Sequence, residues 1–152
     1  MGSVVENRDA RTGNSRVYVD MVGDLFHAGH VSLLREARHH GDWLVVGVLS
    51  DDTAASYKRR PIMSLAERVA VIESCRYVDE VIEDAPFQLT EECLAKHDIA
   101  TVVHGDDLSP RDAEFVYGPA AAAGKLQYVR RTAEISTTQL IQRVLEATSS
   151  SP

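Results

Sequence analysis

The sequence contains little cysteine, no long apolar run and no excess of positive charge. Its only cysteines are Cys75 and Cys93, and neither belongs to a CxxC or Cys/His ligand pattern, so we expect both to be reduced packing residues. No apolar run approaches the roughly 20 residues that span a bilayer. The net charge of −7 argues against nonspecific binding to nucleic acid or anionic lipid, so we expect neither partner. Any anion site must therefore be local.

The length of 152 residues, with 44% hydrophobic and 26% charged residues, predicts one globular domain. The polar start has no apolar segment after its charges, so residues 1–15 are predicted to be a tail and not a signal peptide. This favours a cytoplasmic location. Residues 16–148 are predicted to form the domain, and residues 149–152 a second tail.

Strand-like and helix-like patterns alternate along the predicted domain. β-branched and apolar runs predict five strands, at RVYVDMV, WLVVGVLS, DEVIE, ATVVH and KLQYV. The segments between them and after the last have helical spacing or capping signals. The pattern predicts an α/β fold, a doubly wound, Rossmann-like, parallel five-stranded sheet with helices on both faces. Ligands of such sheets bind beyond the carboxyl ends of the strands.

The segment His27-Ala28-Gly29-His30 lies where the first strand leads into the first helix. The chain has neither a P-loop nor a GxGxxG motif, so this segment is the main candidate for binding phosphate. Gly29 allows close approach to the backbone, the helix start offers free N–H groups, and two imidazoles can donate hydrogen bonds. From spacing alone, a surface His pair or two metal ligands are alternatives, although zinc would need further Cys or His.

Two other segments suit an anion. Ser136 and Gln139 form a capping-box-like pair at the start of the last helix, which is either a second N–H-rich anion site or a plain cap. Lys58, Arg59 and Arg60 form a basic loop in an acidic chain, and a solvated loop is the alternative.

The motif DLFHAGH resembles that of the HxGH nucleotidyltransferases. The similarity continues, in family order, through GDWLVVGVLSDD, KRRPIMSLAER, RYVDEV, HGDDL and RTAEISTT, and it covers residues 17 to about 145. The chain is most similar to the cytidylyltransferases that act on phosphoethanolamine, phosphocholine or glycerol 3-phosphate, and to small bacterial enzymes that activate phosphonates. The resemblance implies transfer of CMP from CTP to a small phosphate or phosphonate acceptor with release of pyrophosphate. It also implies Mg²⁺, held mainly by the triphosphate, and a homodimer.

The resemblance assigns roles to individual residues. It implies catalytic roles for His27, His30, Lys58 and Arg131. It implies nucleotide binding by Gly29, Asp106, Asp107, Arg131, Thr132, Ile135, Ser136, Thr137 and Thr138. Acceptor binding is implied for Asp24, Asp51, Lys58 and Arg68. Asp106 and Asp107 have a turn or helix cap as the alternative, and Arg68 a surface salt bridge.

Two departures from the family pattern stand out, MVGD in place of GTFD and Glu134 where relatives commonly carry Gly. An ATP-dependent adenylyltransferase of the same fold and a non-catalytic nucleotide-binding regulator remain alternatives, although RYVDEV and RTAEISTT favour the cytidylyl branch. For a positively charged acceptor head group, the candidate contacts are Tyr57, Phe87 and Asp24.

Overall fold

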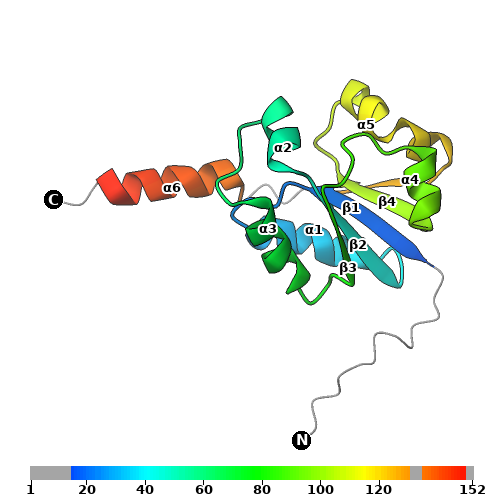
Figure 1. The fold of residues 1–152 in the computed structure, drawn as a ribbon, viewed down its shortest axis with the longest axis horizontal. Helices are drawn as coiled ribbons and strands as arrows, with labels where there is room; N and C mark the ends of the chain where they lie inside the picture. Colours follow the sequence, from blue (N-terminus) through cyan, green and yellow to red (C-terminus); the bar gives the residue numbers. More distant parts are fainter. Residues whose placement is uncertain (1–14, 131–134, 150–152) are drawn as a thin grey trace, which may run out of the picture.

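Strands and helices alternate along the chain in the computed structural model, which describes residues 15–130 and 135–149 (Figure 1). The strands are β1 (Arg16–Met21), β2 (Trp43–Val48), β3 (Glu80–Glu83), β4 (Ile99–Gly105) and β5 (Leu126–Val129). The helices are α1 (Ala28–Arg38), α2 (Asp51–Tyr57), α3 (Leu65–Glu73), α4 (Glu91–Lys96), α5 (Pro110–Ala122) and α6 (Thr137–Ser149). The predicted tails fall almost entirely outside the described residues.

The five strands form one parallel sheet in the order β3-β2-β1-β4-β5, which confirms the predicted fold class. β1 lies in the centre, and all of β1 and β2 after their first residues is buried, as continuous apolar strands predict. From β1 the strand order runs to β2 and β3 on one side of the sheet, and then to β4 and β5 on the other side. The direction of winding therefore reverses between β1 and β4. A ligand crevice is therefore expected at the carboxyl ends of these two strands.

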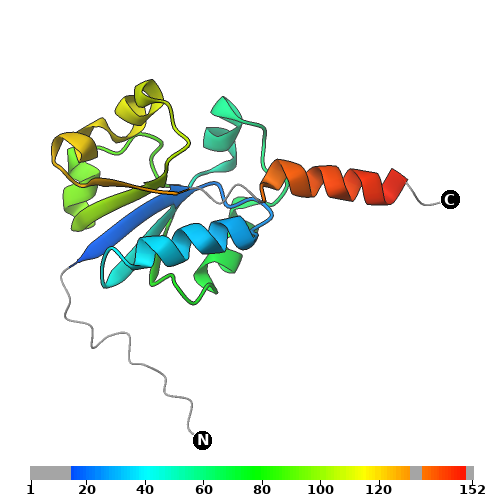
Figure 2. The same cartoon turned by 180° about the vertical axis from the view of Figure 1, so that it is seen from behind.

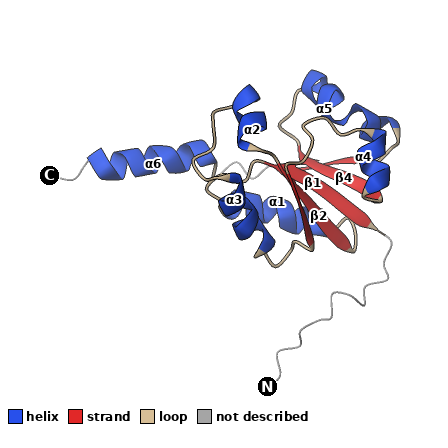
Figure 3. Ribbon diagram, in the orientation of Figure 1, coloured by secondary structure: helices blue, strands red, loops and turns tan. Residues whose placement is uncertain are grey.

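Helices cover both faces of the sheet (Figure 3). On one face α1 and α3 contribute Leu34, Ala37, Val69 and Ile72 to an apolar core with β1 and β2. On the other face α4 and α5 pack Leu94, Val116, Tyr117 and Ala120 against Tyr18 and Val45. Cys75 and Cys93 are free thiols, half-buried against the first and the second core, as predicted for packing residues.

Polar caps fix where the helices begin. Ser64 and Glu67 form a reciprocal capping box at α3. The sequence interpretation did not include α2, a seven-residue helix capped by Ser50. Pro119 lies inside α5, near its end.

The last helix, α6, projects away from the sheet (Figure 2). None of its residues is buried, and Val144 and Leu145 are exposed. Within the described ranges, no helix is long and apolar enough to cross a membrane.

Candidate active site

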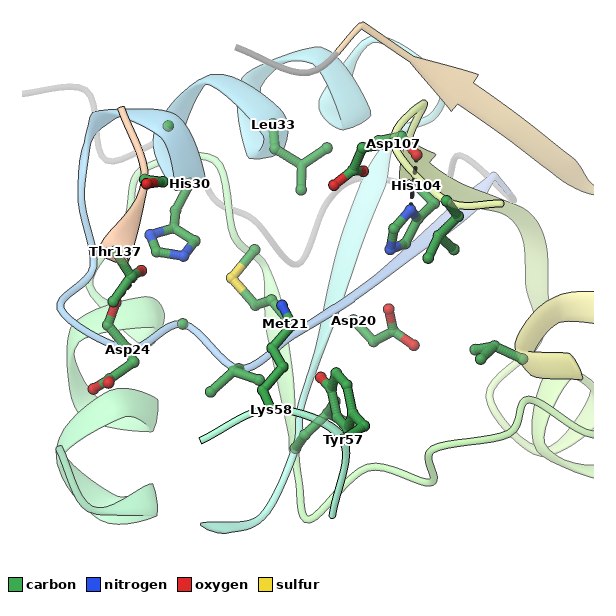
Figure 4. Close-up of a pocket in the computed structure, with 18 of the residues that line it drawn as sticks. Asp20, Met21, Asp24, His30, Leu33, Tyr57, Lys58, His104, Asp107 and Thr137 are labelled. Atoms are coloured by element: carbon green, nitrogen blue, oxygen red, sulfur yellow. Dashed lines mark hydrogen bonds between the residues drawn. The ribbon is translucent and has the colours of Figure 1, made fainter. Parts of the chain in front are cut away.

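A cavity of about 920 Å³ opens at the carboxyl ends of β1 and β4, where the reversal of strand order predicts a crevice (Figure 4). β1 contributes Asp20 and Met21 to its wall, and β4 contributes His104 and Gly105. The volume lies in the range of small-molecule sites.

The start of α1 forms one wall of the cavity. The two histidines of the HAGH segment cap this helix start, because each side chain accepts a hydrogen bond from a nearby backbone N–H group. His27 Nδ1 accepts a hydrogen bond from the Gly29 N–H, and His30 Nδ1 accepts one from the His27 N–H, both at 3.0 Å. The two rings lie 3.9 Å apart between centroids, and Phe26 stacks on His30. A capping role and a site role therefore coincide in the same side chains.

These backbone contacts set the protonation of both rings. Because each Nδ1 accepts a hydrogen bond, the proton of the neutral imidazole is on Nε2. Burial, with the nearby His27 and Lys58, lowers the pKa of His30 to about 4, although Asp24 opposes the shift. His30 is therefore a neutral Nε2–H donor at neutral pH.

The start of α6 lies beside the start of α1. Ser136 and Gln139 form the predicted reciprocal pair, with each backbone N–H donating to the other side chain. Thr137 Oγ1 donates to the Asp24 carbonyl at 3.1 Å and lies 3.3 Å from His27 Nε2. A Cβ on Gly29 would lie 3.2 Å from the Ile135 carbonyl and 2.8 Å from the His27 ring. Only glycine fits between the two N–H-rich helix ends.

The basic loop is held against the same cavity by Asp24. The Asp24 carboxylate accepts the backbone N–H groups of Ile62 and Met63, each at 2.9 Å. Lys58 and Arg59 line the cavity. Arg60 instead pairs with Asp52 on the surface, at 3.0 Å. Figure 4 shows the Lys58 ammonium between His30 and Asp20.

Arg68 and Asp51, predicted near the acceptor, do not line the cavity. Arg68 is 0% exposed, so the alternative of a surface salt bridge is wrong. Its guanidinium pairs with Asp51 and donates to the carbonyls of Val22, Leu49 and Met63. Arg68 thus ties together the segments that surround the site.

Sequence reasoning missed the far end of the cavity, which is centred on Asp20. Its carboxylate is buried and accepts the Tyr117 hydroxyl. Burial raises the pKa of Asp20, while Tyr117 and the nearby His104 oppose the shift. The signal was available, since Asp20 and His104 are polar residues near the carboxyl ends of buried strands.

Aromatic rings flank this carboxylate. Tyr57 stacks on Phe87 with centroids 4.9 Å apart, and Phe87 meets Phe115 at 6.1 Å. All three rings line the cavity, which brings together two of the three candidate contacts for a charged head group. The third candidate, Asp24, lines the cavity next to Thr137 instead.

The remaining predicted residues divide into three groups. Ile135, Ser136, Thr137, Thr138 and Asp107 line the cavity. Asp106 does not line it, and its N–H donates to the Val129 carbonyl. Arg131 and Thr132 lie outside the described residues. Asp79, from RYVDEV, also lies away from this cavity, and its carboxylate accepts the Leu44 N–H.

Comparison with known proteins gives a consistent result. A family model described as cytidylyltransferase-like matches residues 23–143. An ethanolamine-phosphate cytidylyltransferase from Dictyostelium discoideum is 44% identical over 134 residues, which are 88% of this chain and 37% of that protein. Choline-phosphate cytidylyltransferase A from Rattus norvegicus is 40% identical over 133 residues, 86% of this chain and 36% of that protein. The chain thus spans little more than a third of the length of these relatives.

Solved structures share the fold. A lipopolysaccharide core biosynthesis protein from Thermoplasma volcanium is 27% identical, with a TM-score of 0.64 over 78% of this chain and 96% of that one. A pantothenate synthetase from Thermus thermophilus is 18% identical, with a TM-score of 0.55 over 92% of this chain and 66% of that one, and supports the fold alone.

Proposed function

The chain belongs to the cytidylyltransferase-like family, and from that premise we propose that it transfers CMP from CTP to a small acceptor and releases pyrophosphate. The acceptor carries a phosphate or phosphonate group. Relatives named as ethanolamine-phosphate and choline-phosphate cytidylyltransferases support this assignment.

One observation carries the proposal. A single cavity joins the N-termini of α1 and α6 at one end to a buried carboxylate and aromatic rings at the other. Two helix starts with their free N–H groups suit a triphosphate. A carboxylate beside aromatic rings suits a cation. Lys58 lies between the two ends, where the acceptor's phosphate would meet the triphosphate.

The chemistry follows from the protonation of these groups. An acceptor phosphate is already ionised at neutral pH, so its oxygen can attack the α-phosphorus of CTP in line without a general base. The Nε2–H groups of His27 and His30 donate to the oxygens on which charge develops, and the Lys58 ammonium neutralises both reactants. Arg131, predicted to contact the triphosphate, is part of this proposal although it lies outside the described residues.

Mg²⁺ belongs to the proposal as an ion bound to the triphosphate. Among the described residues, no three His, Cys, Asp or Glu side chains are grouped to hold a metal. The oxygen ligands of the magnesium ion would therefore come mainly from phosphate and water. When bound, the ion supplies charge neutralisation to the triphosphate. A homodimer and a cytoplasmic location remain predictions from the sequence.

The proposal is tested by pyrophosphate release from the full chain with Mg²⁺. CTP and ATP are compared against ethanolamine phosphate, choline phosphate, glycerol 3-phosphate and 2-aminoethylphosphonate. We expect release with CTP and at least one acceptor. Lys58→Ala and His27→Ala should lower kcat by about 100-fold or more, because they remove donors to developing charge.

Arg60→Ala is the matched control, because Arg60 lies in the same loop and pairs with Asp52 away from the cavity. Its kcat should change by less than about threefold, as for a surface ion pair. Release only with ATP would move the chain to the adenylyl branch. Turnover near that of the unchanged chain in both Lys58→Ala and His27→Ala would reject the assigned roles.

A further inference from the structure

The Thr137 hydroxyl joins the start of α6 to the start of α1. Its hydrogen is donated to the Asp24 carbonyl oxygen at 3.1 Å, because a carbonyl only accepts. The lone pairs of Thr137 Oγ1 remain to face His27 Nε2, which lies 3.3 Å away. Figure 4 shows Thr137 next to Asp24 at the cavity. A backbone carbonyl thus orients the hydroxyl, and the hydroxyl faces the imidazole.

The opposite side of the same imidazole is fixed as well. His27 Nδ1 accepts the Gly29 N–H at 3.0 Å, so the proton of the neutral ring is on Nε2 and points toward Thr137. The His27 ring therefore has a hydrogen bond at each nitrogen. His30 differs, because no described residue hydrogen-bonds to its Nε2. The two histidines are thus held in different ways, and the orientation of His27 depends on α6.

The contact with Thr137 is long enough to guide the His27 proton without consuming it. Most N–H···O bonds in proteins measure about 2.7 to 3.2 Å between heavy atoms. The bond of 3.3 Å is therefore weak. An ionised phosphate oxygen is a stronger acceptor than a neutral hydroxyl. The proton can thus be shared with a triphosphate oxygen that enters the cavity, while Thr137 keeps the ring from turning away.

The rest of α6 leaves this task to its first residue. No residue of the helix is buried, so its length does not anchor it against the sheet. The hydrogen bonds of Thr137 with Asp24 and His27 fix the helix start beside α1. One hydroxyl therefore sets both the placement of an N–H-rich helix end and the direction of an imidazole donor.

We propose that Thr137 is a positioning residue, whose hydroxyl aims the Nε2–H of His27 at the triphosphate. The inference rests on the proposed function, because this imidazole donor is one of those assigned to developing charge. The role differs from nucleotide binding by Thr137 itself, which the resemblance implies, since the hydroxyl acts here through the imidazole.

A double-mutant cycle tests whether Thr137 acts through His27. Thr137→Val keeps the branched shape and removes the hydroxyl, so kcat for pyrophosphate release should fall by about tenfold, with little change in KM for CTP. His27→Asn keeps a helix cap and removes the Nε2–H, and in that background Thr137→Val should lower kcat by less than about twofold. In the background of His30→Gln, it should again lower kcat by about tenfold.

Two further variants serve as controls. Thr137→Ser retains the hydroxyl and should restore most of the lost kcat. Thr148→Val is the matched control, because Thr148 lies in the same helix and its exposed hydroxyl donates to the carbonyls of Val144 and Leu145. Thr148 does not line the cavity, so kcat should stay within about twofold of that of the unchanged chain.

Nitrogen-15 NMR of the chain without nucleotide gives a readout that does not depend on turnover. The unchanged chain should show His27 protonated at Nε2, with a proton that exchanges slowly with water because it is hydrogen-bonded. The spectrum of His27→Asn assigns the signal. In Thr137→Val the exchange should be about tenfold faster, as one lost hydrogen bond predicts, and in Thr137→Ser it should be nearly unchanged.

Non-additive kcat values together with faster exchange in Thr137→Val support the inference. A loss of kcat from Thr137→Val that persists in the His27→Asn background overturns it, as does a rise in KM for CTP with unchanged kcat, and both results favour direct nucleotide binding by Thr137. Unchanged exchange of the His27 proton in Thr137→Val overturns it as well. Faster exchange with no pyrophosphate release from CTP contradicts the proposed function and leaves the positioning of His27 by Thr137 standing.

Discussion

His30 shows how one side chain can serve both the fold and the site. Its Nδ1 completes the capping box of α1, which requires the neutral ring, and burial keeps the ring neutral. Protonation would replace that acceptor with a donor aimed at the His27 N–H. Acid should therefore disrupt the cap and the donor geometry together.

This coupling predicts a pH-dependent stability. The pKa of His30 is about 4 in the folded chain and about 6.5 when unfolded, so the unfolded state binds more protons between these values. The stabilisation is complete above pH 6.5 and is lost as the pH falls toward 4. Between pH 7 and 4.5 the free energy of unfolding of the unchanged chain should fall by about 2 to 3 kcal/mol more than that of the His30→Gln variant. The glutamine side chain keeps the cap but does not titrate.

Urea unfolding at several pH values measures the difference. If the unchanged chain and His30→Gln lose stability in parallel, His30 is not held neutral by the fold.

Residues that follow a strong local motif were easier to predict than residues defined by a distant partner. His27, Gly29, Ser136 and Thr137 were selected from two short segments, and the structure brings both segments to one cavity. The position of Asp20 near the carboxyl end of a buried strand was an available signal that was not used, whereas its contact with Tyr117, 97 positions away, has no local pattern in the sequence. The roles assigned to all these residues remain predictions.

At the scale of secondary-structure elements, the Asp24 carboxylate holds the loop between α2 and α3 in position. Asp24 accepts two consecutive N–H groups at Ile62 and Met63, and so fixes the end of the loop that begins at Lys58. The sequence predicted Asp24 as an acceptor-binding residue. The geometry supports an indirect role as a positioning residue.

Asp24→Asn distinguishes the two roles. An amide has one acceptor oxygen and would turn an N–H donor toward a backbone N–H, so the free energy of unfolding should fall by about 1 to 3 kcal/mol. Because Lys58 would be displaced, the fold decrease in kcat should be larger than the fold increase in KM for the acceptor. Asp52→Asn, which breaks only the surface pair with Arg60, is the control and should change neither value appreciably.

A large rise in acceptor KM with unchanged stability would instead favour direct binding by Asp24. Urea unfolding and steady-state pyrophosphate release supply both readouts.

The sequence predicted the strands, including the four-residue β3 and β5, and it predicted the six-residue helix α4, but it did not predict α2. The five strands and their parallel arrangement follow from β-branched runs alternating with helical patterns. α2 escaped prediction because it is seven residues long and buries only Ala54, so it has no apolar face to detect. The sequence signal for α2 was the cap residue Ser50, but serine is also common in turns.

Across the whole molecule, the two apolar layers meet at a sheet whose central packing requires glycine. Tyr18 of β1 is 1% exposed and lies across Gly47 of β2, where a Cβ would approach the Tyr18 hydroxyl oxygen to 2.1 Å and the Ala85 Cβ to 2.8 Å. No side chain fits there unless the tyrosine moves. The layer formed by α4 and α5 therefore depends on this glycine.

Gly47→Ala should accordingly lower the free energy of unfolding by about 1 to 3 kcal/mol through overpacking. Gly118→Ala in α5 is the matched control, since its Cβ would meet only the flexible Glu114 side chain at 3.1 Å, and its effect should stay within about 1 kcal/mol. Urea denaturation of both variants measures this difference. Equal effects would show that the β2 position is not tightly packed.

The central place of β1 has a consequence for synthesis of the protein. β1 is made first and pairs with β2 on one side, while its other edge waits for β4, where Arg16 meets Ile99. At ribosomal rates of about 5–20 residues per second, that edge stays unpaired for roughly 4 to 17 s. An unpaired strand edge is a template for aggregation. The interval between synthesis of β1 and synthesis of β4 is thus the stage at which this chain most needs a chaperone.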